Sequence, residues 1–348
     1  MLAAIRGART SITFSNYLWQ KGAIAEEIAE AVAGRCRAGV EADVLIDAVG
    51  SHDMSREARE RMERAGCRVA DFHPVNPLNV RRLNHRNHRR VLVVDGRLAV
   101  TGGTGIGSQW TGDGRHPGHW RQTDVVAEGP IVRHVQAAFA DTWRDATGIL
   151  LGGEAYFPDL EPRGDVAAQS VRSSARAGGS EAYALFLLAI EGARASIRIT
   201  TPYFVPDVDI AAALRRAAGR GVNVEVIVAG AADTFPDRVV RRASQGAYGH
   251  ALEAGVKIYE YGPALLHAKT MTIDGRWASI GSVNLDNRSF ALNHEASLVV
   301  SDSGLARRLD EIFRDDLRFS REVTLESWKR RGIGRFLEPF LLPFRNLL

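Results

Sequence analysis

The chain has 348 residues, a formal net charge of +4, and 45% hydrophobic and 25% charged residues. This composition is typical of globular proteins and too apolar for a disordered chain, and the length suits about two domains of ~100–200 residues. The longest uncharged apolar run, residues 182–190, is shorter than the ~18 residues of a spanning helix. Because Arg6 comes early, we also expect no apolar secretion signal at the N-terminus.

The predicted elements follow an α/β order that occurs twice along the chain. A segment with helical periodicity, residues 23–37, precedes a β-branched run, and residues 210–218 precede a similar run in the second half. Three pairs of short segments match in the same order: 7–12 with 192–197, 38–46 with 220–228, and 65–69 with 254–258. The chain therefore contains an internal duplication of α/β units, each built around a sheet.

The join between the two copies is the stretch 152–180, which is rich in Gly, Pro, Ser and Arg. Residues 166–171 inside it could form a strand. We place the boundary near residue 160, which gives a first half at 1–160, a second half at 161–320 and a C-terminal tail at 321–348.

The tail is basic and apolar. Residues 329–348 carry five basic side chains and one acid, so this segment accounts for the whole +4 and residues 1–328 are formally neutral. Such a mixture suits an anionic membrane surface, but a terminal helix docked on the body has similar support. Pro339 and Pro343 interrupt any long regular helix there.

The chain has only two cysteines, Cys36 and Cys67. They lack partner histidines at metal-ligand spacing and are too few for a disulfide scaffold. A reducing, cytosolic setting fits this count best.

The strongest motif is repeated once in each half. The second half has His267, Lys269 and Asp274 in the pattern His-x-Lys-x4-Asp, and the first half has His88, Arg90 and Asp95 at the same spacing. Residues two apart on a strand share a face, so each histidine and its cation should project together and reach one phosphate.

Asp95 and Asp274 lie an odd number of residues from the histidines and are followed by Gly96 and Gly275 between two apolar runs. Asp-Gly at this place is a turn signal. We therefore expect both aspartates to be structural.

Two imidazoles can divide the work of phosphoryl transfer. A neutral imidazole attacks phosphorus and a charged one protonates the leaving oxygen. If the halves pair about a pseudo-twofold axis, His88 and His267 flank one phosphorus for in-line displacement, and no metal is needed. Lys269, Arg90 and Asn284 would stabilise the phosphoryl oxygens.

These motifs resemble the phospholipase D superfamily and, within it, the bacterial cardiolipin synthases. The likeness covers nearly the whole chain and includes segments beyond the two His motifs: residues 128–130, 200–206, 281–289 and 328–331. It implies two tandem phospholipase D-like α/β/α sandwich repeats related by a pseudo-twofold axis. It also implies transfer of a phosphatidyl group between phosphatidylglycerol molecules without a cofactor, with His88 as nucleophile and His267 as general acid.

The first half departs from the family pattern at three positions. Arg90 replaces a Lys, Gly105 stands where the second half has Asn284, and Gln122 stands where relatives usually have Asp. An acid bonded to the far nitrogen of a catalytic His fixes its tautomer. We expect Glu295 to serve the second half in this way, and Asp124 to replace the missing acid of the first half.

Three functions remain open at this stage. The first is a lipid phosphatidyltransferase that works on phosphatidylglycerol and is compatible with a monomer. It would be a cytoplasmic protein, held at the inner face of the cell membrane by the tail. The second is a phosphodiesterase that hydrolyses lipid or nucleic acid, although the neutral body argues against a nucleic-acid partner. The third is a degenerate homologue that only binds anionic lipid. The basic run 81–90 with His85 fits either an anion-binding loop or a solvated one.

Overall fold

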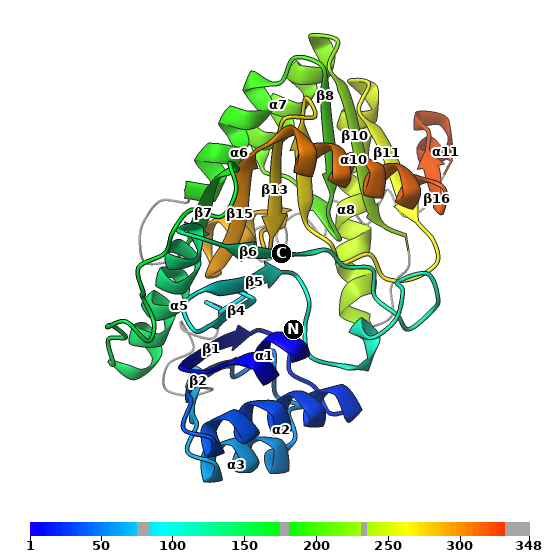
Figure 1. Ribbon diagram of the computed structural model, residues 1–348. Coiled ribbons are helices and arrows are strands. Elements are labelled where there is room, and N and C mark those ends of the chain that lie inside the picture. Colours follow the sequence, from blue (N-terminus) through cyan, green and yellow to red (C-terminus); the bar gives the residue numbers. More distant parts are fainter. Residues whose placement is uncertain (75–83, 175–180, 231–234, 331–348) are drawn as a thin grey trace.

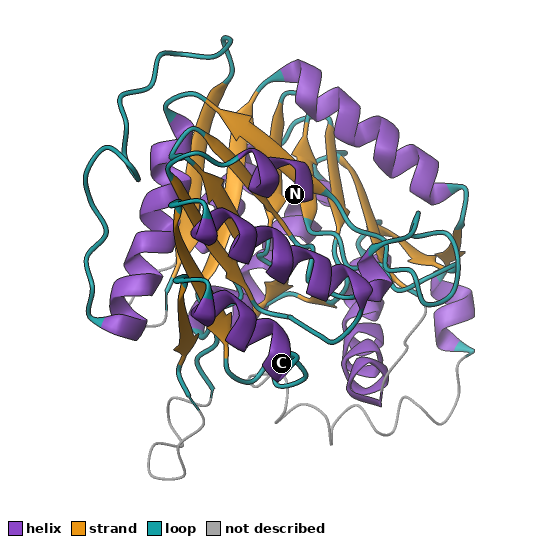
Figure 2. Ribbon diagram, turned by 60° about the horizontal axis from the view of Figure 1, so that its bottom comes forward, coloured by secondary structure: helices purple, strands orange, loops and turns teal. Residues whose placement is uncertain are grey.

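The computed structural model describes residues 1–74, 84–174, 181–230 and 235–330. The two halves form two mixed sheets, each with helices on both faces (Figures 1 and 2). In Figure 1 the first half begins in blue at the bottom and continues through cyan to the green helix α5 (Ile131–Thr147), and most of the second half, from green to orange, lies above it.

The first sheet has the strand order β3-β2-β1-β4-β5-β6. Its strands are β1 (Ser11–Asn16), β2 (Glu41–Asp47), β3 (Arg68–Phe72), β4 (Val91–Val94), β5 (Leu98–Gly102) and β6 (Asp124–Glu128). One face is covered by α1 (Leu2–Gly7), α2 (Ala23–Arg37) and α3 (Arg56–Arg64), and the other by α5 (Ile131–Thr147). In α2 the buried side chains recur at helical spacing, which explains why this segment forms an amphipathic helix on the sheet.

The second sheet has the order β16-β11-β10-β8-β12-β13-β15-β7. Its strands are β7 (Ala167–Ser173), β8 (Ser196–Thr200), β10 (Asn223–Ala229), β11 (Lys257–Tyr261), β12 (Thr270–Ile273), β13 (Trp277–Gly281), β15 (Glu295–Ser301) and β16 (Ser320–Val323). The helices are α6 (Glu181–Gly192), α7 (Val208–Gly219), α8 (Phe235–Glu253), α9 (Asn287–Ala291), α10 (Ser303–Leu317) and α11 (Leu325–Lys329). Short pieces complete the chain: η1 (Ser108–Trp110), and the two-stranded pair β9 (Phe204–Val205) and β14 (Leu285–Asp286).

The two sheets repeat one topology. In each, three parallel strands continue into three antiparallel ones, so that β1, β4, β5 and β6 correspond to β8, β12, β13 and β15. The registers agree as well, because Gly102 pairs with Asp124 across β5 and β6 and Gly281 pairs with Ser297 across β13 and β15. The predicted fold class, two tandem α/β/α repeats, is confirmed.

The halves exchange backbone contacts in a reciprocal way. Asn87 bridges to His294 in parallel, and Arg121 bridges to Leu266 in the same manner. The buried Arg89 adds a further connection, since its guanidinium donates to the carbonyls of Ala138 on α5, Glu295 on β15 and Ser173 on β7. The backbone at each motif histidine therefore pairs with a segment of the opposite half.

Residues 167–173 form the strand expected within the join, β7, at the edge of the second sheet. We propose the domain boundary near residue 160, in the segment that links α5 to β7.

The expected tail begins later than residue 321. Residues 320–323 form β16, which pairs antiparallel with β11, and the Trp328 indole donates to the carbonyl of Gln245 on α8. These residues belong to the second half because a sheet edge and an aromatic contact hold them. Residues 331–348 lie outside the described part of the chain, as do residues 81–83 of the basic run.

Cys36 and Cys67 form a disulfide that joins α2 to the segment before β3, with a Cα–Cα distance of 5.7 Å. The cysteine count predicted no disulfide scaffold and a reducing setting, and this single bond is a feature that the count did not predict. Two cysteines distant in sequence pair here because α2 packs against this strand edge.

Within the described residues, no helix is long and apolar enough to cross a membrane.

Candidate active site

The four repeated motif residues meet where the two halves face each other. His88 and Arg90 directly precede β4, and His267 and Lys269 directly precede the equivalent strand β12. Between 4% and 8% of each residue remains exposed, so the cluster is buried. The chain therefore brings each imidazole together with its cation, in the predicted pseudo-twofold arrangement.

A single guanidinium spans the two imidazoles. The Nη2 atom of Arg90 lies 3.3 Å from Nε2 of His88, and its Nη1 atom lies 3.3 Å from Nδ1 of His267. Arginine only donates hydrogen bonds, so each of these two ring nitrogens accepts one. The space between the two imidazoles therefore holds one small planar ionic group, the guanidinium.

Lys269 lies on the other side of His267. Its Nζ is 3.1 Å from both ring nitrogens of His267 and donates a hydrogen bond to the backbone carbonyl of the same residue at 2.6 Å. Two cations from different halves thus flank the same imidazole.

Glu295 bonds to the first-half histidine. Both of its carboxylate oxygens lie 2.9 Å from Nδ1 of His88, and the side chain is fully buried. We had expected Glu295 to serve His267, and this contact is a correction. The physical reason is the reciprocal bridge between the halves, in which the amide of His88 donates to the carbonyl of His294 at 2.9 Å. Ser282 and Asn293 donate further hydrogen bonds to the same carboxylate.

Asp124 has a different role from the one expected. Its carboxylate accepts hydrogen bonds from the amides of Gly103 and Thr104 at 3.0 and 3.1 Å and from the Thr104 hydroxyl. It therefore fastens the turn after β5 and does not contact His88. Residues 122 and 124 lie on the same face, as expected for a two-residue step. That face, however, lies beside His267 of the opposite half and not beside His88.

Gln122 is the structural counterpart of Glu295, because each lies two residues before the residue that pairs with Gly102 or Gly281. The neighbouring Arg121 carbonyl accepts from the amide of His267 at 2.8 Å, which mirrors the contact beside His88. His267 has no carboxylate within hydrogen-bond distance among the described residues, and its ring bonds to the backbone of Gly103. The Oε1 atom of Gln122 is buried without a hydrogen-bond partner in the described structure.

The two motif aspartates hold turns. Asp95 accepts from the amides of Arg9, Thr10 and Ser11, and Asp274 accepts from the equivalent amides of residues 194–196. Both residues have positive φ, 55° and 52°, at the tight turns after β4 and β12. These contacts lie away from the imidazoles, as expected for structural residues.

Asn284 and Gly105 show how the halves differ. The Asn284 Oδ1 atom is buried without a hydrogen-bond partner in the described structure, which leaves this amide available to a ligand. At Gly105 a Cβ would lie 2.5 Å from the Trp110 indole, so Trp110 fills the space that an asparagine side chain would take.

Aromatic rings contact both histidines, and no motif in the sequence indicated these contacts. The Trp120 ring centre lies 5.2 Å from that of His267, Trp110 lies 6.2 Å from it, and the two indoles contact each other. Tyr17 makes an edge contact with His88 at 4.9 Å. The only signal in the sequence was the nearness of two tryptophans to the first-half glycines, which does not specify a contact with the second-half histidine.

Burial lowers the pKa of each positively ionising group in the cluster. Desolvation lowers the pKa of His88 below 6.5 against the opposing effect of Glu295, and burial with Lys269 and Arg90 lowers that of His267 much further. Burial, followed by the charge of Arg90, also holds the pKa of Lys269 well below its usual range. Burial brings the pKa of Arg90 to about 10. An anion between these groups would relieve their mutual repulsion.

Among the described residues, one group of three side chains has the geometry of a metal site, namely Asp113, His116 and His119. None of them belongs to the histidine cluster. The fold and the cluster together define a duplicated α/β protein with a two-histidine phosphoryl-transfer centre.

Comparisons with known proteins give the family. A family model described as "Cardiolipin synthase, PLD-like domain" matches residues 186–317. The major cardiolipin synthase ClsA of Bacillus subtilis (strain 168) is 31% identical over 354 residues, which cover 98% of this chain and 72% of that protein. A cardiolipin synthase of Alkalihalophilus pseudofirmus is 33% identical over 352 residues, covering 98% of this chain and 69% of its own. The chain belongs to the cardiolipin synthase family of phospholipase D-like proteins.

Among solved structures, the phosphatidylserine synthase of Haemophilus influenzae Rd KW20 has a TM-score of 0.69 at 14% identity, with 100% of this chain and 92% of that chain covered. This likeness shows the shared fold. The predicted family and the predicted enzyme class, a phospholipase D-type phosphatidyltransferase or phosphodiesterase, are confirmed.

Proposed function

We propose that the protein transfers a phosphatidyl group from one phosphatidylglycerol molecule to another, giving cardiolipin and glycerol through a phosphohistidine. The observation that carries this proposal is the pair of imidazoles on either side of the Arg90 guanidinium, of which only His88 has a carboxylate partner among the described residues. Membership of the cardiolipin synthase family supports the choice of lipid.

His88 is the nucleophile in this scheme. The hydrogen bond from its Nδ1–H to Glu295 leaves the Nε2 lone pair facing the gap, where Arg90 now donates to it. In the first step Nε2 attacks phosphorus, and the bond from phosphorus to the oxygen of the headgroup glycerol breaks. Protonated His267 gives its proton to that oxygen, and free glycerol leaves.

The second step runs in the reverse sense. Neutral His267 takes the proton of a primary hydroxyl on the second phosphatidylglycerol, whose oxygen attacks the phosphorus bound to His88. The phosphorus–nitrogen bond then breaks and cardiolipin is formed. Glu295 stabilises the charge on His88 while the phosphohistidine exists.

Three side chains would hold the phosphoryl oxygens. Lys269 supplies a buried cation, and the buried Asn284 supplies a side-chain NH2 group that can donate a hydrogen bond to a phosphoryl oxygen. Arg90 must move aside from its position between the imidazoles and then pair with the phosphodiester. The anion also raises the lowered pKa of His267, which makes that imidazole a better proton carrier when substrate is bound.

The surroundings of the reaction form part of the proposal. We propose that phosphatidylglycerol in an anionic membrane surface is the partner, that the basic residues from Lys329 onward contact that surface, and that the protein acts as a monomer at the inner face of the cell membrane. The formally neutral stretch 1–328 gives no electrostatic support for a nucleic-acid partner.

The test is incubation of the purified protein with phosphatidylglycerol vesicles and mass-spectrometric detection of cardiolipin and glycerol. His267→Ala should abolish the products, and His250→Ala, which alters an exposed histidine on α8, should not. Phosphatidic acid in place of cardiolipin would assign the protein to the hydrolases.

A second candidate, a lipid-binding protein without turnover, is favoured by Trp110 filling the asparagine position of the first half. It predicts vesicle binding that survives His88→Ala and no product from the unmodified protein. Measuring vesicle co-sedimentation and product in the same samples separates the two candidates.

A further inference from the structure

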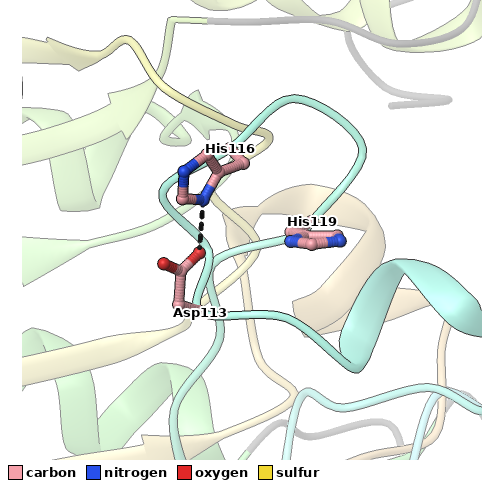
Figure 3. Close-up of side chains that lie close together, drawn as sticks. All are labelled: Asp113, His116 and His119. Atoms are coloured by element: carbon pink, nitrogen blue, oxygen red, sulfur yellow. Dashed lines mark hydrogen bonds and ion pairs between the residues drawn. The ribbon is translucent and has the colours of Figure 1, made fainter.

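A cluster of metal-ligand side chains lies in the loop between Trp110 and Trp120. Asp113, His116 and His119 are spaced three residues apart, and one ligand atom from each lies within 4.8 Å of the other two (Figure 3). Nδ1 of His116 is 3.1 Å from a carboxylate oxygen of Asp113. Three donors therefore converge from one short segment.

The donor set selects a class of ion. Two imidazoles and one carboxylate suit borderline divalent transition metals such as Zn²⁺ and are a poor match for Ca²⁺ or Mg²⁺, which prefer oxygen ligands. Three protein ligands leave a fourth position for water. Asp113 and His116 are more than half exposed, so an ion reaches them directly from solvent.

The loop is shaped so that the third ligand can approach. A Cβ on residue 112 would lie 2.0 Å from Nδ1 of His119, so only glycine permits this position of the imidazole. Gly118, directly before His119, has a φ of +82°, which favours glycine as well. The Nδ1 atom of His119 is buried and has no hydrogen-bond partner within the described structure.

The loop is also held in place by the second half. The hydroxyl of Tyr261 donates to the carbonyl of Gly114 at 2.8 Å, and Arg121 forms a two-pronged ion pair with Asp316 at 2.8 and 2.9 Å. The Arg115 guanidinium lies 4.8 Å above the Phe319 ring. These contacts hold residues 114, 115 and 121, so metal binding has to order only the short segment between them, which carries His116 and His119.

We propose that Asp113, His116 and His119 bind one Zn²⁺ ion, and that this ion fixes the loop whose ends place Trp110 and Trp120 against His267. The site lies outside the histidine cluster, and the proposal does not depend on the lipid reaction.

The first test is zinc titration of the full chain, free of purification tag and stripped of metal, by isothermal calorimetry. One equivalent should bind, and His116→Ala, His119→Ala and Asp113→Asn should each weaken binding at least ~100-fold, since even the loss of an outer-shell partner costs about 10–100-fold. His250→Ala is the matched control, because His250 also pairs with an acid three residues away, Glu253, and no third ligand joins them among the described residues. It should bind zinc like the unmodified protein.

A second measurement guards against misfolded variants and tests the effect on the loop. Zinc should raise the melting temperature of the unmodified protein and slow amide hydrogen exchange in a peptide covering residues 111–121, and it should do neither in the three variants. Absence of stoichiometric binding, or binding that all three variants retain, overturns the site. Binding without slowed exchange in this peptide overturns the role in fixing the loop.

Discussion

Glu295, from the second half, accepts a hydrogen bond from Nδ1 of His88, from the first half, with both carboxylate oxygens at 2.9 Å. The corresponding position beside His267 carries Gln122, and no carboxylate contacts that ring among the described residues. The duplicated centre is therefore asymmetric. Glu295 opposes the lowering of the pKa of His88 by burial, whereas Lys269 and Arg90 add to the lowering of the pKa of His267.

Removal of this carboxylate should strongly impair turnover. In Glu295→Gln the charge that supports His88 is lost while the side-chain shape is kept, and we expect kcat to fall roughly 10³–10⁴-fold, as for other orienting carboxylates of catalytic histidines. The measurement is cardiolipin formation from phosphatidylglycerol vesicles under saturating lipid.

Asp124→Asn is the matched comparison for that variant. Since Asp124 fastens the Gly103 and Thr104 amides, its substitution should cost about 1–3 kcal/mol of the free energy of unfolding and reduce kcat far less. A fall in kcat equal to that of Glu295→Gln would restore Asp124 as the partner of His88.

The pH dependence should follow His267. Its pKa is lowered by burial, Lys269 and Arg90, so in the free enzyme the proton that it must donate is lost already below pH 6.5. The basic limb of kcat/KM should therefore lie at acidic pH. Gln122→Glu adds a carboxylate of the same size at the position equivalent to Glu295, which should raise the pKa of His267 and move the limb to higher pH. Gln122→Leu should show no upward movement, and an unchanged limb in Gln122→Glu would contradict the assignment.

Gly105 and Trp110 should be energetically coupled. An asparagine at 105 would press its Cβ into the Trp110 indole, so Gly105→Asn alone should lower the free energy of unfolding by about 1–3 kcal/mol and reduce turnover. In Gly105→Asn combined with Trp110→Ala the collision is removed. Urea unfolding of all four members of this cycle should give a coupling of ~0.5–3 kcal/mol. Additive effects would show that the two positions do not share space.

The Cys36–Cys67 bond should be chemically detectable. Alkylation of the denatured protein without reductant should modify no cysteine, and prior reduction should release both. Cys36→Ser combined with Cys67→Ser should lower the free energy of unfolding by roughly 3–4 kcal/mol, because the bond closes a long loop of the unfolded chain. In excess reductant the variant and the unmodified protein should unfold alike. Two alkylated cysteines without reduction would contradict the pairing.

The sequence by itself determined the duplication, the α/β order and the two motif turns. These features are local: each turn is marked by an adjacent pair, Asp95-Gly96 or Asp274-Gly275, and each histidine lies two residues from its own cation. Spacing along one strand is enough to predict such relationships, because strand geometry is the same wherever a strand lies.

Only the tertiary structure decided which acid serves which histidine. Both sequence expectations assumed partners within one half, but the parallel bridges place residues 294–295 beside His88 and residues 121–122 beside His267. The same holds for the Cys36–Cys67 bond, for Trp110 in the space at Gly105, and for residues 320–329 in the second half. Each depends on how two distant segments pack, and packing distances are not encoded in residue spacing.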